Sequence, residues 1–191
     1  TLDAGDFTMG SLFHLLARDE ACELKLLGAM GYDAVTLGQQ EFALKPDGLA
    51  QFLTAAKAQK NLPKIVFAGA VFSPKSADDA LEVAFADIPV VPYAVVEKGG
   101  MKIGIFGLLG KKAARQAASA AAPLLFRDPV ETAREIVHLL RTKEKADIVI
   151  CLSHGGLDID LRQSEDEILA LQVKGIDIIV GGASHHHLRK P

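Results

Sequence analysis

Short apolar runs rich in Val and Ile alternate along this chain with stretches of helical period, a pattern typical of a layered α/β domain. The apolar runs predict strands over 33–37, 64–67, 101–108, 147–152 and 177–180. Two of the runs, "DIVICL" and "DIIVGG", are almost continuously apolar, which favours strands buried on both faces. The pattern therefore predicts sheet strands covered by helices.

The clearest helix start is "DPVETAREIVHLL", where Asp128 can cap, Pro129 takes the first turn and Glu131 completes a capping box. Two further helices are predicted over 49–59 and over 20–30, the second closed by Gly31 in a left-handed conformation. The segment 73–98 contains Pro74, Pro89 and Pro92 and predicts a loop with a shorter strand pair at a sheet edge. The Ala-rich stretch "AARQAASAAAP" is compatible with a helix or a mobile loop.

Composition narrows the class of protein. At 191 residues, 49% hydrophobic and 24% charged, the chain predicts one compact domain over residues 1–191. A net charge of -3 with scattered Lys and Arg argues against nucleic acid or an anionic membrane as a partner. No apolar run approaches the roughly 20 residues of a membrane span. Cys22 and Cys151 form neither a disulfide framework nor a metal motif, and both are interpreted as small buried hydrophobes.

Polar side chains follow several of the predicted strands, where ligands collect in open α/β sheets. They comprise Gly38, Gln39, Gln40 and Glu41 after the first strand, Ser153 and His154 after "DIVICL", Gly181 to His185 after "DIIV", and Asp3 and Asp6 after a strand stub at the start of the chain. Carboxylate, amide and imidazole groups should therefore converge on one edge. Such a set of oxygen and imidazole ligands suits Mn, Zn or Fe.

Each of these residues also has a simpler interpretation. Asp3 and Asp6 are types that stabilise turns with their own side chains. His154 alone is compatible with a hydrogen-bonded surface histidine, and His185 with its two following histidines is compatible with an exposed loop. Gln39 and Gln40 are ordinary polar residues for a turn.

Four blocks, "DAGD", "GYDAVTLGQQEF", "LSHGG" and "GIDIIVGGASHH", resemble in order and spacing those of the calcineurin-like metallophosphoesterases, in particular the 5'-nucleotidase branch. The resemblance runs from Leu2 to about His187. It implies a layered α/β sandwich of the metallophosphoesterase type, with two sheets flanked by helices. It also implies two metal ions that bind a phosphate ester and activate a water for in-line attack.

The resemblance assigns roles to individual positions. Asp6 matches the carboxylate that bridges the two metals, His154 a ligand of the second metal and His185 a ligand of the first. Gln39 stands at an Asn that ligates the second metal, Gln40 at the His that protonates the leaving oxygen, and Glu41 closes the same block. The expected metal set is thus Asp6, Gln39, His154 and His185, and the expected catalytic set is Gln40 and Glu41.

Three of these positions depart from the family pattern. Gln39 is one methylene longer than Asn, and a metal site tolerates displaced ligands poorly. Gln40 cannot donate a proton as an imidazolium does, which removes general acid catalysis worth about 10²–10⁴-fold. Ala183 replaces the first imidazole of the Gly-His-x-His block and offers no ligand. These departures predict one bound divalent metal or none.

Three expectations follow. The first is a phosphoesterase that hydrolyses nucleotides or related small phosphate monoesters with reduced or lost activity. The second is an inactive domain of the same fold that binds a ligand or a partner protein. The third, compatible with either, is that the chain is a fragment lacking its first strand and a C-terminal substrate domain. Members of this branch are mostly exported, so the resemblance implies a periplasmic or extracellular location.

Overall fold

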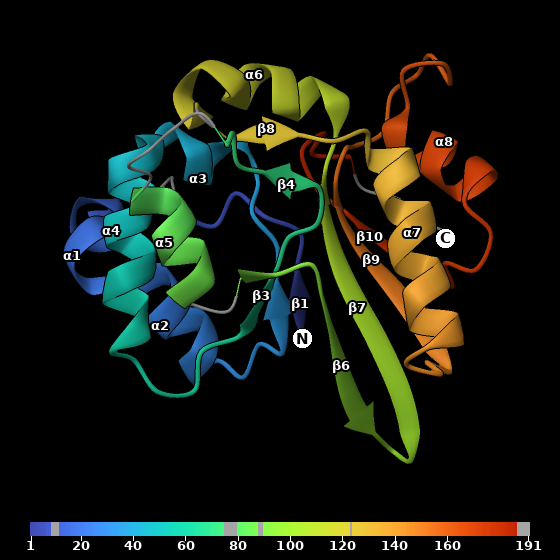
Figure 1. Ribbon diagram of the computed structural model, residues 1–191, viewed down its shortest axis with the longest axis horizontal. Helices are drawn as coiled ribbons and strands as arrows, with labels where there is room; N and C mark the ends of the chain where they lie inside the picture. The colour runs from blue at the N-terminus through green and yellow to red at the C-terminus, as the bar shows by residue number, and fades with distance from the viewer. Residues whose placement is uncertain (9–11, 75–79, 88–89, 123, 187–191) are drawn as a thin grey trace.

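The computed structural model describes residues 1–8, 12–74, 80–87, 90–122 and 124–186 (Figure 1). Its first sheet consists of β1 (Leu2–Asp3), β2 (Ala34–Val35), β3 (Lys64–Val66) and β5 (Val90–Val91), all parallel and adjacent in that order. The second sheet has the order β10 (Ile178–Gly181), β9 (Ile148–His154), β7 (Met101–Leu109) and β6 (Tyr93–Lys98). In this second sheet only β6 runs antiparallel. A small antiparallel pair joins β4 (Ala70–Val71) to β8 (Leu125–Phe126).

Helices lie on the outer faces of the two sheets (Figure 1). The helices of the described residues are η1 (Leu12–Leu16), α1 (Ala17–Glu20), α2 (Cys22–Ala29), α3 (Gln39–Ala43), α4 (Lys45–Lys57), α5 (Ala80–Asp87), α6 (Lys111–Ala121), α7 (Pro129–Thr142) and α8 (Glu165–Gln172). The layered α/β fold with two flanked sheets is therefore confirmed. No helix in these ranges is both long enough and apolar enough to cross a membrane.

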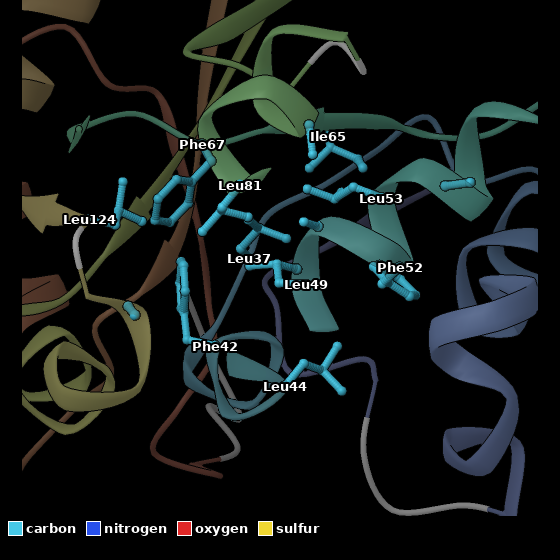
Figure 2. Packing of buried hydrophobic residues seen from close by; sticks show 14 of the residues in the cluster. Leu37, Phe42, Leu44, Leu49, Phe52, Leu53, Ile65, Phe67, Leu81 and Leu124 are labelled. Carbon is cyan, nitrogen blue, oxygen red and sulfur yellow. The ribbon is translucent and has the colours of Figure 1, made fainter. Parts of the chain in front are cut away.

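Three apolar clusters hold the layers together. The first lies between the first sheet and α1–α6, and Figure 2 shows Phe42, Phe52 and Leu53 within it. A second, which includes Val66 and Leu152, fills the space between the sheets. The third joins α7 and α8 to the outer face of the second sheet. Apolar side chains on both faces of β7 and β9 explain why these strands read as continuous apolar runs in the sequence.

Local signals in the sequence account for the best predicted helix ends. Asp128 Oδ1 accepts hydrogen bonds from the N–H groups of Val130 and Glu131, which caps α7 as predicted. After α2, the N–H of Gly31 donates to the Gly28 carbonyl and that of Tyr32 to the Leu27 carbonyl. Gly31 has a φ of 76°, so this end is a Schellman cap and the role predicted for the glycine is confirmed.

The helix predicted over 20–30 is confirmed as α2, but it begins at Cys22, because Ala21 with a φ of 46° separates it from α1. Two predictions about the elements were wrong. "DIIVGG" was predicted to be buried on both faces, but β10 is an edge strand in which Ile178 is exposed. The segment 73–98 contains helix α5, and β5 and β6 do not pair with each other because they are edge strands of different sheets. Pro89 lies outside the described residues. The Ala-rich stretch is helical in α6, and its last residue, at position 123, lies outside the described ranges.

Candidate functional site

Loops that carry polar side chains meet at the carboxyl ends of the parallel strands. Asp6 follows β1, Gln39 and Gln40 begin α3 after β2, His154 ends β9, and His185 follows β10. Because side chains alternate along a strand, His154 continues the face of Ile150 and Leu152, which lies between the two sheets. Its Nε2 lies 3.2 Å from Asp6 Oδ2. The centre of the site is therefore a contact between residues of different sheets.

Glu41 is fully buried and accepts four hydrogen bonds. Its Oε2 accepts from the N–H groups of Asp6 at 3.0 Å and Gly38 at 2.6 Å. Its Oε1 accepts from the N–H of Thr8 at 3.0 Å and from the Thr8 hydroxyl at 2.9 Å. Burial raises the pKa of the Glu41 carboxyl, although these hydrogen bonds act in the opposite direction. Glu41 ties the loop after β1 to the start of α3, and its catalytic role stays a prediction.

Asp6 is held with its carboxylate beside His154. Its φ of 65° lies in the left-handed region, which is uncommon for a residue other than glycine. Its Oδ1 accepts a hydrogen bond of 2.8 Å from the N–H of Gln40. Burial raises the pKa of Asp6, but contact with His154, the Gln40 hydrogen bond and the charges of His154 and His185 outweigh it and lower the pKa below its ordinary value. Asp6 is therefore an anion at neutral pH.

His154 is almost fully buried, and its Nδ1 lies 2.6 Å from the Ala4 carbonyl oxygen. Since a carbonyl only accepts, Nδ1 carries the hydrogen and Nε2 faces Asp6. The buried Nε2 makes no hydrogen bond within the described ranges, so its contact with Asp6 is electrostatic. Burial lowers the pKa of His154, but contacts with Asp6 and the Ala4 carbonyl and the charges of Asp6 and Glu41 raise it overall. Such a nitrogen beside a carboxylate can share a proton or a cation with it.

Two glycines allow the chain segments to approach this closely. A Cβ atom on Gly38 would lie 2.4 Å from Asp6 Oδ1 and 2.7 Å from His154 Cε1. Gly5 has a φ of 95°, and a Cβ atom there would lie 2.6 Å from the Gly38 nitrogen. The turn after β1 and the turn after β2 therefore meet backbone to backbone beneath His154.

The remaining predicted site residues lie around this centre. Gln39 and Gln40 are half-buried, and their side chains make no hydrogen bond to the described part of the chain. His185 is exposed, yet its charge contributes to the low pKa of Asp6. Ala183 occupies the loop after β10 with a φ of 65°. His187 lies outside the described residues.

A buried pair that the sequence did not indicate supports the end of β9. The Ser153 hydroxyl donates to Asp166 Oδ1 at 2.5 Å, and both side chains are buried. Burial raises the pKa of Asp166, with the Ser153 hydrogen bond opposing it. Because Asp166 lies in the first turn of α8, the pair fixes that helix to the strand residue next to His154. Asp3, by contrast, accepts from the Gly5 N–H at 2.9 Å, as the simpler interpretation of a turn residue expects.

The chain is similar to known phosphoesterases over almost its whole length. It is 32% identical over 202 residues to the trifunctional nucleotide phosphoesterase protein YfkN of Bacillus subtilis, covering 96% of this chain and 13% of YfkN. It is 30% identical to the snake venom 5'-nucleotidase of Gloydius brevicauda, covering 98% of this chain and 29% of that protein. The crystal structure of the 5'-nucleotidase precursor from Thermus thermophilus superimposes with a TM-score of 0.74 at 33% identity, covering 96% of this chain and 32% of that one.

The chain belongs to the calcineurin-like metallophosphoesterase superfamily, in its 5'-nucleotidase branch. No family model matches it. The chain spans less than a third of the length of the two curated relatives described above. The residues at the carboxyl ends of its parallel strands fall within the four sequence blocks that resemble this family.

Members of this superfamily are generally metal-dependent. Asp6 and His154 fit two ligands of one divalent cation, because a buried imidazole nitrogen that makes no hydrogen bond to the described residues faces a carboxylate. No group of three or more His, Cys, Asp or Glu side chains able to hold a metal occurs among the residues that the structure describes. The donor set therefore fits one cation incompletely and gives no support for a second.

Proposed function

We propose that this chain is a 5'-nucleotidase-like phosphoesterase domain that binds nucleotide or related phosphate monoesters with one divalent cation and hydrolyses them slowly. The observation that carries the proposal is the contact of Asp6 with His154 Nε2, which makes no hydrogen bond within the described residues, at the carboxyl ends of parallel strands from both sheets. Mn, Zn or Fe fits this mixed oxygen and nitrogen pair. When bound, the cation would neutralise phosphate charge and acidify a bound water.

The residues of the chain have separate tasks in this proposal. Asp6 supplies the negative charge that holds the cation, and the Ala4 carbonyl keeps His154 in the tautomer whose Nε2 can ligate. Glu41 positions Asp6 by accepting a hydrogen bond from the Asp6 N–H. His185, exposed on the loop after β10, contributes a charge that lowers the pKa of Asp6.

Slow turnover follows from the two glutamines. The Gln40 amide can donate a hydrogen bond to a phosphate oxygen, but it cannot transfer a proton to a leaving alkoxide. The leaving group must then take its proton from water, which costs about 10²–10⁴-fold in rate. Gln39 can offer an amide oxygen, and Ala183 offers no ligand.

A second candidate function is ligand binding without turnover. The specific observation in its favour is that the described residues gather no three metal-binding side chains at this edge. In that case Asp6 and His154 share a proton instead of binding a cation, and the domain binds a phosphate ester or a partner protein. The periplasmic or extracellular location stays part of the proposal, supported by the venom origin of one relative.

The test combines metal analysis with phosphate release. The purified chain is incubated with manganese or zinc, freed of excess metal, analysed for bound metal, and assayed for phosphate release from AMP. We expect about one metal per chain and slow turnover. Asp6→Ala should abolish both, whereas Asp19→Ala, an exposed carboxylate on α1, should change neither. Unchanged phosphate release in Asp6→Ala would overturn the mechanism.

A triple variant separates the two candidate functions. Gln39→Asn, Gln40→His and Ala183→His together introduce the residues that the family has at these three positions, including its proton donor. If the chain is a slow enzyme, turnover should rise by up to about 10²–10⁴-fold and metal content should increase. If the original chain binds AMP but releases no phosphate over days, the second function is correct. No gain of metal in the triple variant would contradict the matching of these three positions.

A further inference from the structure

A cavity of about 260 Å³ lies on the opposite side of β9 from His154. Ser153 and Gly155, the two neighbours of His154 in the chain, line it together with Leu108 at the end of β7. Strand alternation explains the placement, because Ser153 follows Cys151 onto the helix-covered face of the sheet. Helices α6, α7 and α8 surround the ends of these strands (Figure 1). One layer of backbone thus separates the cavity from the site described above.

The floor of the cavity is apolar. Leu108 and Leu169 are buried, and Val130 on α7 is nearly so. Ile168 on α8 and Pro129 at the start of α7 extend this surface toward the opening. Such a surface favours an apolar group because its burial removes apolar area from water.

The mouth of the cavity is cationic. Lys111, Lys112, Arg115 and Arg162 line it, against the two carboxylates of Asp158 and Glu165. Glu165 already accepts hydrogen bonds from the N–H groups of Lys111 and Lys112. Lys111 Nζ lies 2.7 Å from Asp128, and Arg162 pairs with Asp160 at 2.9 Å.

Two of the four cations are not neutralised. Lys112 and Arg115 form no ion pair with any acidic side chain that the structure describes. They lie one turn apart at the start of α6, whose first turn contains no acidic residue. Positive side chains are unfavourable at this end of a helix, since the helix dipole is positive there too. The Glu165 carboxylate offsets the dipole at the N–H groups of Lys111 and Lys112, but no acidic side chain that the structure describes pairs with the charged ends of Lys112 and Arg115. A bound anion would neutralise these two side chains.

We propose that this cavity binds a small organic anion consisting of one apolar ring and one carboxylate. The ring would lie on Leu108, Val130 and Leu169, and the carboxylate would face Lys112 and Arg115. The volume supports this size, because a cavity of about 150 Å³ holds a benzene molecule and the remainder suffices for a short acidic side chain. The proposal does not depend on the function of the Asp6–His154 site, which lies on the other face of β9.

The test uses phenylacetate as the probe and its neutral analogue phenylacetamide as the control ligand. Binding to the ¹⁵N-labelled chain is followed by amide chemical shifts, without added metal or nucleotide. We expect phenylacetate to bind with a Kd of roughly 1 mM or tighter, and phenylacetamide at least about tenfold more weakly. The shift changes should centre on Leu108, Ser153 and Ile168.

Variants assign the binding to this cavity. The double variant Lys112→Gln with Arg115→Gln should weaken phenylacetate binding by about tenfold, because both free charges are removed. The matched control, Lys60→Gln with Lys102→Gln, changes the net charge equally at exposed positions outside the cavity and should bind as the original chain does. Ile168→Phe narrows the cavity, keeps every charge, and should also weaken binding.

Three results of the titrations with the unchanged chain would overturn the proposal. These are no saturable binding up to about 10 mM, equal binding of phenylacetate and phenylacetamide, or shift changes that centre on Asp6 and Gln40. Unchanged affinity in the Lys112 and Arg115 double variant would do so as well. Circular dichroism of each variant shows that the fold is retained, so that lost binding is attributed to the cavity.

Discussion

The strands of the first sheet are two or three residues long, whereas β7 and β9 of the second sheet run for nine and seven residues. In the second sheet, His154 is held by the ladder itself, because it pairs in register with Leu109 of β7. In the first sheet the ladder ends before Asp6, and the buried Glu41 carboxylate holds the loop instead. One half of the site therefore depends on strand pairing and the other on a single side chain.

The largest expected effect is the loss of that side chain. Glu41→Ala leaves the N–H groups of Asp6, Gly38 and Thr8 and the Thr8 hydroxyl without their acceptor. Since unsatisfied buried donors each cost about 1–3 kcal/mol, we expect the free energy of unfolding to fall by about 4 kcal/mol in urea titration. The amide signals of Asp6 and Gly38 should shift, while those of β9 away from His154 should not.

Glu20→Ala provides the control for this change. Glu20 is an exposed carboxylate with one loose ion pair to Lys25 at 3.6 Å, so its loss should alter stability by no more than about 0.5 kcal/mol. A Glu41→Ala chain as stable as the Glu20→Ala chain would show that the loop after β1 is held by other contacts.

A core truncation in the second half should reduce stability without altering the site. Leu140 on α7 is fully buried against Gly104 of β7, so Leu140→Ala should cost about 3 kcal/mol of unfolding free energy. Because the ladder of β7 and β9 remains, the ring signals of His154 should stay unchanged in NMR spectra. Altered His154 signals would mean that packing of α7, and not strand pairing, sets the histidine position.

The smallest effect concerns the cap of α7. The ion pair with Lys111 lowers the pKa of Asp128 below its ordinary value of 3.8, burial opposes it, and the helix N–H groups lower it further. Because the pKa of Asp128 is lower in the folded state, its ionised form stabilises the fold at pH values above the ordinary pKa. This stabilisation is lost as the pH falls through the folded-state pKa. Asp128→Ala should thus cost about 1 kcal/mol near neutral pH and less once the pH has fallen through the folded-state pKa of Asp128.

Asp128→Asn separates the cap from the ion pair. Asn caps helices as well as Asp does, so this variant should lose only the part of the stability that depends on Lys111. If the free energies of unfolding of Asp128→Ala and the original chain differ by a constant amount down to about pH 2, this would contradict the lowered pKa of Asp128.

The sequence predicted the long elements better than the short ones. The apolar runs of β7 and β9 and the cap at Asp128 act locally, and the pattern identified them. Strands β4, β5 and β8 have two residues each, too few to produce a period of two. The left-handed break at Ala21 depends on tertiary packing and not on a residue type that favours it.

The sequence indicated where the candidate site lies, but not the buried hydrogen bonds that hold its loops in place. Strand ends indicated Asp6 and His154, and the structure brings them within 3.2 Å. The partners of Glu41 lie 33 to 35 residues away in Thr8 and Asp6, and Asp166 bonds Ser153 across 13 residues. Such long-range hydrogen bonds leave no pattern in the sequence, so the sequence could not show that Glu41 holds the loop after β1.

The close approach at Gly5 and Gly38 has a consequence for protein engineering. The two turns meet through Gly5 and Gly38, so their close approach beneath His154 is made by backbone atoms and not by the side chains of Gln39 and Gln40. Positions 39 and 40 should therefore accept other side chains without moving these turns. The domain can serve as a scaffold in which different ligands are introduced at these two positions by substitution alone.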